Sequence, residues 1–166
     1  MKRLVVYQSF TGFTQQYAEW IAKELNCEAH ALNNVSKQAL SEYEMIIFGG
    51  WVMGNTVVGL DKVQKACNGK LIVFAVGASE RSREVIHDII EANRLGTLPF
   101  FYMQGGIQFE KLDFMKRNML VLTRKKLSKK KNKTSRDLFM EKVLSASFDA
   151  SDKRYIKLLV DYLSVD

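Results

Sequence analysis

The segment RLVVYQSFTGFTQQYAEWIAKEL, residues 3–25, joins two different patterns. Residues 3–7 form an apolar run rich in β-branched side chains, which predicts a buried strand. From residue 14 to residue 25 the apolar positions recur at helical spacing, which predicts a helix. The chain is therefore expected to pass from a strand through a short turn directly into a helix.

The rest of the sequence repeats this alternation. Further strands are predicted at 28–32, 45–51, 70–79 and 100–106, and further helices at 60–66, 83–95, 110–127 and 149–163. Strands that are apolar along their whole length are buried on both faces, which indicates a parallel sheet covered by helices. We therefore expect an α/β three-layer sandwich, with ligands bound at the carboxyl ends of the strands.

Composition limits the organisation of the chain. With 166 residues, 47% of them hydrophobic, and a single proline, the sequence predicts one domain over residues 1–166 without a linker. No apolar run is long enough to span a membrane, and the two cysteines indicate no disulfide framework, so a cytoplasmic location is expected. No cluster has metal-ligand spacing, and the net charge of +7 favours an acidic partner.

The turn after the first strand is rich in hydroxyl groups. Ser9, Thr11 and Thr14 surround Gly12 at the start of the predicted helix. Free backbone N–H groups and the helix dipole attract a phosphate at such a turn, and hydroxyl groups add donors. The alternative is that Thr14 caps the helix and the other hydroxyls are ordinary turn residues. The turn lacks both the GxxxxGK[ST] and the GxGxxG patterns, so a phosphate held by neutral donors is the expected ligand.

These residues also carry a family resemblance. The sequence SFTGFT, residues 9–14, is similar to the flavodoxin phosphate-loop pattern [ST]-x-T-G-x-T at every fixed position. The resemblance implies a flavodoxin-like fold with a five-stranded parallel sheet in the order 2-1-3-4-5, and FMN as cofactor. It further implies that Ser9, Thr11, Gly12 and Thr14 hold the FMN phosphate, together with the backbone N–H groups of Phe10 and Phe13.

Two later loops are expected to contact the flavin ring. The flavodoxin likeness assigns this role to Trp51, Val52, Met53, Gly54 and Asn55 after the third strand, and to Gly77, Ala78, Ser79, Glu80 and Arg81 after the fourth. Trp51 is a flat partner for the ring, although it could instead be a core or rim residue, and Met53 could cover the ring in its place. Arg81 could stabilise a reduced, anionic flavin or simply be solvated. The second loop lacks the aromatic residue usual in flavodoxins, which predicts an open flavin face.

A basic segment precedes the last predicted helix. Residues 110–136 combine apolar positions with Arg124, Lys125, Lys126, Lys129, Lys130, Lys131, Lys133 and Arg136. This helical insertion could contact an anionic membrane surface, an acidic redox partner or a porphyrin-type substrate, or it could be a solvated, mobile loop. Nucleic acid is unlikely as a partner, because no aromatic residues are interleaved between 124 and 136.

The segment from Gly105-Gly106 through FEKLDFMKR resembles the menaquinone-dependent protoporphyrinogen oxidase branch of the flavodoxin-like superfamily. That resemblance implies an FMN-dependent oxidoreductase that passes substrate hydrogens to the flavin and electrons to a quinone, near the inner face of a membrane. Two alternatives remain open. One is a flavodoxin-type electron carrier, which the positive charge disfavours; the other is a non-redox module that binds phosphate or nucleic acid.

Overall fold

The structure is a computed structural model that describes residues 2–164. Its centre is a parallel sheet in the order β2-β1-β3-β5-β6. The strands are β1 (Arg3–Gln8), β2 (Glu28–Ala31), β3 (Met45–Met53), β5 (Lys70–Gly77) and β6 (Phe100–Gln104). Counted among the parallel strands alone, this is the predicted order 2-1-3-4-5. A short strand that was not predicted, β4 (Thr56–Val57), pairs antiparallel with the end of β3.

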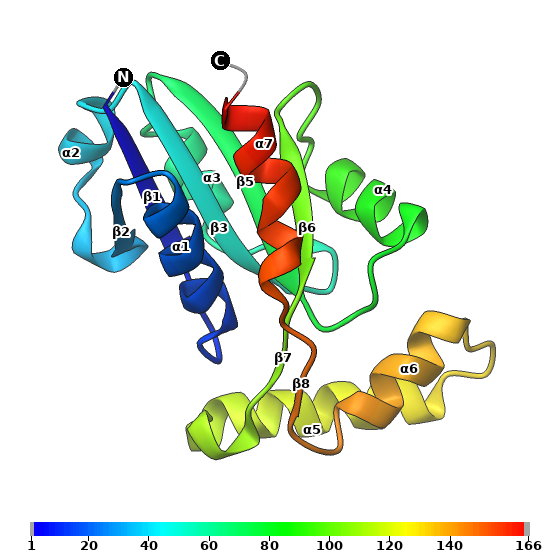
Figure 1. Ribbon diagram of the computed structural model, residues 1–166. Helices are drawn as coiled ribbons and strands as arrows, with labels where there is room; N and C mark the ends of the chain where they lie inside the picture. Colours follow the sequence, from blue (N-terminus) through cyan, green and yellow to red (C-terminus); the bar gives the residue numbers. More distant parts are fainter. Residues whose placement is uncertain (1, 165–166) are drawn as a thin grey trace.

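Helices cover both faces of the sheet and complete a three-layer fold (Figure 1). The helices α1 (Phe13–Glu24) and α7 (Lys157–Ser164) lie on one face; α3 (Leu60–Gln64) and α4 (Arg83–Ala92) lie on the other. Two short elements that were not predicted, η1 (Leu32–Asn34) and α2 (Lys37–Ser41), connect β2 to β3. The last helix starts later than expected, because Asp152 caps η3 (Lys153–Ile156), which leads into α7.

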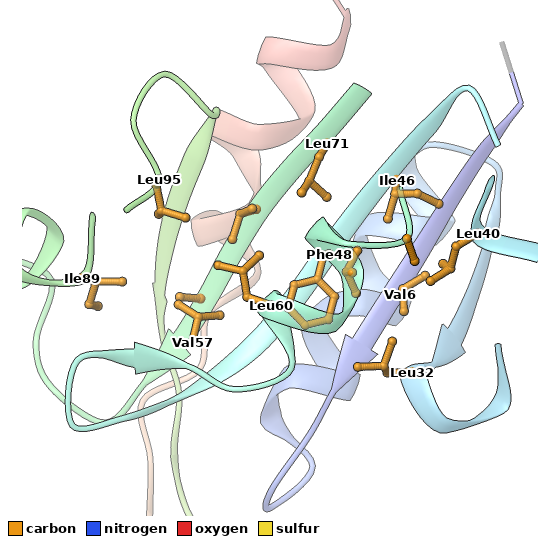
Figure 2. Packing of buried hydrophobic residues seen from close by; sticks show 14 of the residues in the cluster. Val6, Leu32, Leu40, Ile46, Phe48, Val57, Leu60, Leu71, Ile89 and Leu95 are labelled. Atoms are coloured by element: carbon orange, nitrogen blue, oxygen red, sulfur yellow. The ribbon is translucent and has the colours of Figure 1, made fainter. Parts of the chain in front are cut away.

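The alternation of side chains along each strand produces two cores. In β3, Ile46 and Phe48 pack with α3 and α4, whereas Met45 and Ile47 pack with α1 and α7. Figure 2 shows the first of these cores, where Leu60 of α3 and Ile89 of α4 meet residues of the sheet. Because both faces are covered, the central strands are apolar at successive positions, which is why they could be predicted from the sequence.

A helical hairpin interrupts the chain between β6 and the last helix. It consists of β7 (Gly106–Ile107), η2 (Phe109–Lys111), α5 (Phe114–Lys129), α6 (Ser135–Val143) and β8 (Phe148–Asp149). The helix predicted at 110–127 in fact begins at Phe114, because the Asp113 side chain accepts the Lys116 N–H at 2.8 Å and caps it. Most of the basic segment 110–136 is thus helical, and α6 (Ser135–Val143), which was not predicted, follows it.

The hairpin lies across the carboxyl ends of the parallel strands, beyond the sheet (Figure 1). Strands β7 and β8 form the neck that carries it, pairing Gly106 with Asp149 and Ile107 with Phe148. A side chain on Gly106 would lie 2.1 Å from the Phe148 carbonyl oxygen, so only glycine allows this approach. Within residues 2–164 no helix combines the length and the apolar composition that crossing a membrane would require.

Candidate functional site

The turn between β1 and α1 is open at the N-terminus of the helix. Gly12 is the N-cap, with a φ of 100° that favours glycine, and no side chain caps the first turn. Ser9 closes the turn instead, because its Oγ accepts the Gly12 N–H at 3.1 Å. The first helical hydrogen bond is that from the Gln16 N–H to the Gly12 carbonyl, at 3.0 Å. The interpretation of Thr14 as a helix cap is therefore wrong.

Two buried threonines at this turn have hydroxyls without a hydrogen-bond partner among the described residues. Thr11 is 8% exposed and Thr14 is 1% exposed, and both line the same cavity. Neither hydroxyl oxygen is fully enclosed, because among the described residues Gln108 Oε1 is the only fully buried side-chain oxygen or nitrogen without a partner. The free hydroxyls and the uncapped N–H groups thus form a set of donors suited to an anion.

A small cavity of about 90 Å³ adjoins these hydroxyls. Its walls come from the phosphate-loop turn, the ends of β3 and β5, the neck and the hairpin: Phe10, Thr11, Phe13, Thr14, Trp51, Val52, Val76, Gly77, Ala78, Gly106, Ile107, Leu120, Met140 and Leu144. Phe10 and Trp51 stack at the side of this cavity, with ring centroids 4.4 Å apart and ring planes at 20°. The turn after β1 and the end of β3 are thus held together by an aromatic contact.

The hairpin covers the cavity with apolar side chains. Leu120 of α5 and Leu144, directly after α6, are buried in a cluster of their own with Ile107, and Phe10, Ala78 and Met140 pack against it. The expectation of an open face at the second loop is therefore wrong. The usual aromatic residue is missing from that loop, but an element distant in the sequence supplies the cover.

A second cavity of about 430 Å³ lies beside the first, between the strand ends and the hairpin. The two cavities share Val52, Gly77, Ala78 and Met140 as walls. Small-molecule pockets in proteins typically measure roughly 300–1,000 Å³. The volume of the second cavity falls in that range even without the first cavity. The first cavity extends this space toward the phosphate-loop turn.

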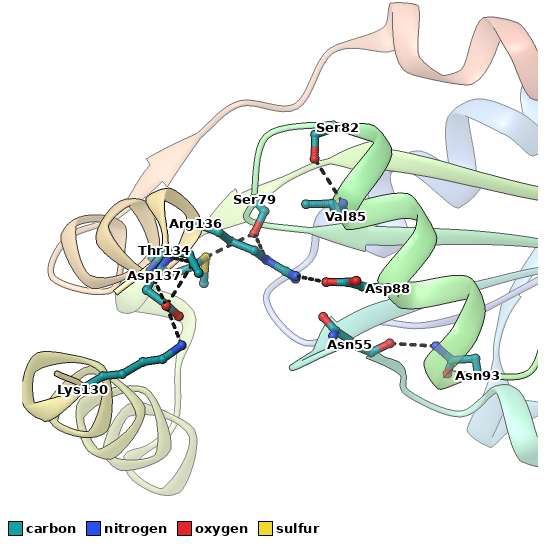
Figure 3. A network of polar contacts seen from close by, with 11 residues as sticks. Asn55, Ser79, Ser82, Val85, Asp88, Asn93, Lys130, Thr134, Arg136 and Asp137 are labelled. Atoms are coloured by element: carbon teal, nitrogen blue, oxygen red, sulfur yellow. Dashed lines mark hydrogen bonds and ion pairs between the residues drawn. The ribbon is translucent and has the colours of Figure 1, made fainter. Parts of the chain in front are cut away.

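Polar contacts hold the hairpin to α4 and to the loop after β5 (Figure 3). Arg136 donates through Nε to Ser79 Oγ at 3.3 Å, and through Nη1 to Asp88 at 3.2 Å. Within the hairpin, Lys130 pairs with Asp137 at 2.6 Å. Hydrogen bonds from the Lys130 side chain and the Thr134 backbone lower the pKa of Asp137 to about 2. The cations that line the second cavity are thus already neutralised by the protein.

Two side chains of β6 hold the loop after β5 by hydrogen bonds. The hydroxyl group of Tyr102 donates to the Ser79 carbonyl at 2.7 Å, and Gln104 Nε2 donates to the Ala78 carbonyl at 3.2 Å. Burial raises the pKa of Tyr102 well above its ordinary value, so the hydroxyl stays protonated as a donor. Both loop carbonyls therefore point into the protein.

Most of the residues predicted for the site come together at this edge of the sheet. The phosphate-loop residues Phe10, Thr11, Phe13 and Thr14 line the first cavity with Trp51, Val52, Gly77 and Ala78; Gly54, Asn55 and Ser79 line the second. Met53, Glu80 and Arg81 line neither of these two cavities, and all three are exposed. Arg136, rather than Arg81, is the cation that contacts the loop after β5.

Sequence reasoning missed the residues that the hairpin contributes. Leu120, Met140 and Leu144 belong to helices whose buried sides depend on contacts with each other and with the sheet edge. The apolar positions of α5 do not share one buried side, because Met115 and Leu122 are 81% and 58% exposed. The only local signal was Gly105-Gly106, which marks where the chain leaves the sheet.

No match is found among proteins of curated function. Several solved structures resemble the chain. A WrbA-like flavodoxin protein from Agrobacterium tumefaciens is 19% identical, with a TM-score of 0.46 over 61% of this chain and 83% of that one. Oxidised Flavodoxin 2 from Bacillus cereus is 20% identical, with a TM-score of 0.46 over 63% and 84%. A flavoprotein in complex with FMN from Lactobacillus acidophilus is 16% identical, with a TM-score of 0.44 over 62% and 91%.

A comparison with a protein-family model shows which family this chain belongs to. The model described as Flavodoxin domain matches residues 4–135, which include the phosphate-loop turn, all five parallel strands and α5. The sequence of this chain thus follows the family pattern over most of its length. The chain belongs to the flavodoxin domain family.

Proposed function

We propose that this protein binds FMN at the carboxyl edge of its sheet. The observation that carries the proposal is the pair of unpartnered hydroxyls that the buried residues Thr11 and Thr14 place at the first cavity, beside an uncapped helix N-terminus. Such donors suit the phosphate group of FMN. The adjoining cavities have room for the flavin ring beside Val52, Gly77 and Ala78, provided that the contact between Phe10 and Trp51 adjusts.

Each part of the site has its own task in this proposal. Thr11, Thr14 and the N–H groups of the first turn of α1 hold the phosphate. Trp51 offers a flat surface to the ring, and the loop after β5 contacts the ring edge. When bound, the flavin supplies the redox chemistry, and the protein supplies binding, orientation and a dry environment.

We further propose an oxidoreductase with its own substrate rather than a simple electron carrier. A carrier exchanges electrons through an exposed flavin edge, whereas Leu120, Met140 and Leu144 cover this site. A cover excludes water and encloses a cavity in which a substrate can approach the ring. The positive net charge also departs from the acidic surface typical of carrier flavodoxins.

The substrate pair suggested by the sequence is a porphyrinogen and a quinone. Support comes from the helical hairpin between β6 and α7, the feature on which the resemblance to menaquinone-dependent protoporphyrinogen oxidases rests. The cavity itself adds no free cation for a carboxylate, because Lys130 and Arg136 are paired with Asp137 and Asp88. Five other cations of this segment have no ion-pair partner among the described residues and are exposed: Arg124, Lys125, Lys126, Lys129 and Lys131.

We also propose that this outer surface contacts an anionic membrane. Phe114, Met115, Val121 and Leu122 are large apolar side chains exposed on α5, and Lys125, Lys126 and Lys129 follow on the same face by helical spacing. A helix that combines exposed apolar side chains with lysines binds the interface of anionic bilayers. A quinone dissolved in such a bilayer would then lie close to the covered site.

The first test is flavin retention. Purified protein is mixed with FMN, freed of excess cofactor, and its visible absorption spectrum is recorded. Wild type and the surface control Thr97→Glu are expected to retain flavin bands, and Thr14→Glu is expected to lose them because it places a negative charge at the phosphate. Thr14→Val keeps the shape and removes only the hydroxyl, so it is expected to weaken FMN binding roughly tenfold. A wild-type protein that retains no flavin would overturn the proposed function.

The second test separates an enzyme from a carrier. FMN-loaded protein is incubated anaerobically with a porphyrinogen and a menaquinone-type quinone, and porphyrin formation is followed by its absorbance. Turnover that depends on both the flavin and the quinone supports the oxidoreductase. Electron exchange with a flavodoxin reductase and no turnover would favour the carrier.

A further inference from the structure

The hairpin places a lysine against the phosphate-loop turn. Lys111, at the end of η2, brings its Nζ so close that a methyl group built on Gly12 would lie 3.9 Å from it. In the sequence, strands β2 to β7 lie between Gly12 and Lys111. The two residues come close together because the neck directs the hairpin back over the turn. The phosphate-loop residues 9–14 contain no charged side chain of their own.

The position of Lys111 is fixed by several backbone contacts. The Phe109 N–H donates to Ser147 Oγ at 2.9 Å, and Arg117 donates to the Phe109 carbonyl at 2.9 Å. The Lys111 N–H donates to the Gln108 carbonyl at 3.1 Å. The short helix that carries the lysine is therefore tied to both ends of the hairpin, and the lysine does not belong to a freely moving loop.

The ammonium group of Lys111 has no ion-pair partner among residues 2–164. Its neighbour Glu110 accepts from Ser147 Oγ at 2.7 Å, and a hydrogen bond from that hydroxyl lowers the pKa of the Glu110 carboxyl. The nearby Lys116 differs, because it pairs with Asp113 at 3.6 Å and lies over the Phe10 ring, 5.3 Å from its centroid. Of these two lysines at the turn, Lys111 is the one without an ion pair among the described residues, although its charge also acts on the neighbouring Glu110 carboxylate.

We propose that Lys111 is a phosphate-binding residue that the hairpin adds to the phosphate-loop turn. This inference rests on the proposed binding of FMN. A phosphate monoester carries nearly two negative charges at neutral pH, and the hydroxyls of Thr11 and Thr14 offer it only neutral donors. Lys111 neutralises part of that charge from the outer side of the turn. The hairpin that covers the ring thus also contributes to selecting the phosphorylated flavin over riboflavin.

The test compares two ligands that differ only in the phosphate group. FMN and riboflavin are titrated against wild type, Lys111→Ala, Lys111→Arg and the control Lys129→Ala, and Kd is obtained from the change in flavin fluorescence. Lys129 is an exposed lysine on the outer face of α5. Lys111→Ala is expected to weaken FMN binding about tenfold or more and to leave riboflavin binding unchanged. Lys111→Arg is expected to restore most of the affinity, and Lys129→Ala to match wild type.

The outcomes distinguish this inference from the proposed function. Wild type that binds neither flavin overturns the FMN proposal and the role of Lys111 with it. Wild type that binds FMN, together with a Lys111→Ala variant of equal FMN affinity, overturns only the role of Lys111. An equal loss of FMN and riboflavin affinity in Lys111→Ala also overturns it, because such a loss reports a change in the hairpin and not in phosphate binding.

Discussion

At the scale of single residues, Tyr17 joins three parts of the chain. It is fully buried in α1, and its hydroxyl group donates to the Gln104 carbonyl at 2.5 Å and accepts the Asp152 N–H at 3.0 Å. Gln104 ends β6 just before the neck, and Asp152 caps η3 just after it. One hydroxyl therefore fixes the two chain segments that lead into and out of the hairpin. Burial raises the pKa of Tyr17 far above its ordinary value, which keeps this donor protonated.

We predict that Tyr17→Phe lowers the free energy of unfolding by about 1–3 kcal/mol, because it leaves a buried carbonyl and a buried N–H without their partner. Urea denaturation followed by circular dichroism measures this difference. The control is Tyr162→Phe, whose ring is 40% exposed and which is expected to change stability little. Equal midpoints for wild type and Tyr17→Phe would show that water replaces the hydroxyl at no cost.

Residues were predictable where their function depends on local sequence. Residues 9–14 follow one another in the chain, so their spacing alone was enough to predict a phosphate-loop turn, and Phe10, Thr11, Phe13 and Thr14 of this turn line one cavity. The position of Lys111 and the stacking of Phe10 on Trp51 depend on contacts between segments that are distant in the sequence. The local spacing of residues does not predict such contacts. The role of Arg81 near the ring stays a prediction, whereas the contact of Arg136 with that loop from the hairpin could not be predicted from local sequence.

At the scale of elements, the hairpin is stabilised by its own capping interactions. Thr134 caps α6 by accepting the Asp137 N–H at 3.1 Å, while Asp137 accepts the Thr134 N–H at 2.8 Å. Asp137 also pairs with Lys130, just after the end of α5. This one carboxylate therefore connects the two helices of the hairpin across their turn.

The low pKa of Asp137 predicts an acid-sensitive hairpin. The pKa falls from 3.8 to about 2 on folding, so the ionised carboxylate stabilises the folded state; this stabilisation is present above about pH 4 and is lost as the pH falls through about 2. Hydrogen exchange between pH 4 and pH 2 is expected to show the amides of α6 losing protection before those of β5. Asp137→Asn should expose α6 to exchange at neutral pH, and the control Asp161→Asn should not. Protection of α6 that is equal at both ends of this range in wild type would contradict the prediction.

Elements of the sheet and its helices were predicted because their buried faces are set by a large, regular core. The hairpin helices lack that constraint. In α5 the buried residue is Leu120, with Met119 and Leu127 partly buried beside it, because α6 and the sheet edge lie on that side. Helical spacing alone did not show which side of α5 is buried, because that depends on its contacts with α6 and the sheet edge.

At the scale of the whole molecule, the α/β sandwich carries the helical hairpin, which covers the candidate site. The alternation of strands and helices predicted the parallel sheet, and the flavodoxin resemblance implied the order that the structure has, β2-β1-β3-β5-β6. The position of the hairpin did not follow from that pattern, because it depends on a neck of only two short strands, β7 and β8. Figure 1 shows the result: the hairpin extends beyond the carboxyl ends of the strands, where the candidate site lies. Whatever binds the outer face of α5 is therefore brought near that site.

This arrangement predicts that the protein binds anionic membranes through α5. Vesicles of phosphatidylcholine with phosphatidylglycerol are expected to cosediment with the protein, vesicles of phosphatidylcholine alone much less, and added salt should weaken the binding. Each lysine near an anionic surface contributes about 1 kcal/mol, so the triple variant Lys125→Glu, Lys126→Glu, Lys129→Glu should bind at least a hundredfold more weakly. The control Lys37→Glu, Lys62→Glu, Lys65→Glu changes the net charge equally but lies on exposed positions of other elements.

The two triple variants separate a specific surface from overall charge. If only the α5 variant loses binding, the outer face of α5 is the membrane contact, and Phe114→Ser should weaken binding further by removing a 79% exposed apolar side chain. If both variants lose binding equally, the attraction comes from the net charge of +7 and no face of the molecule is preferred. In that second case the hairpin would retain its place over the candidate site, but it would not orient that site toward a quinone in the bilayer.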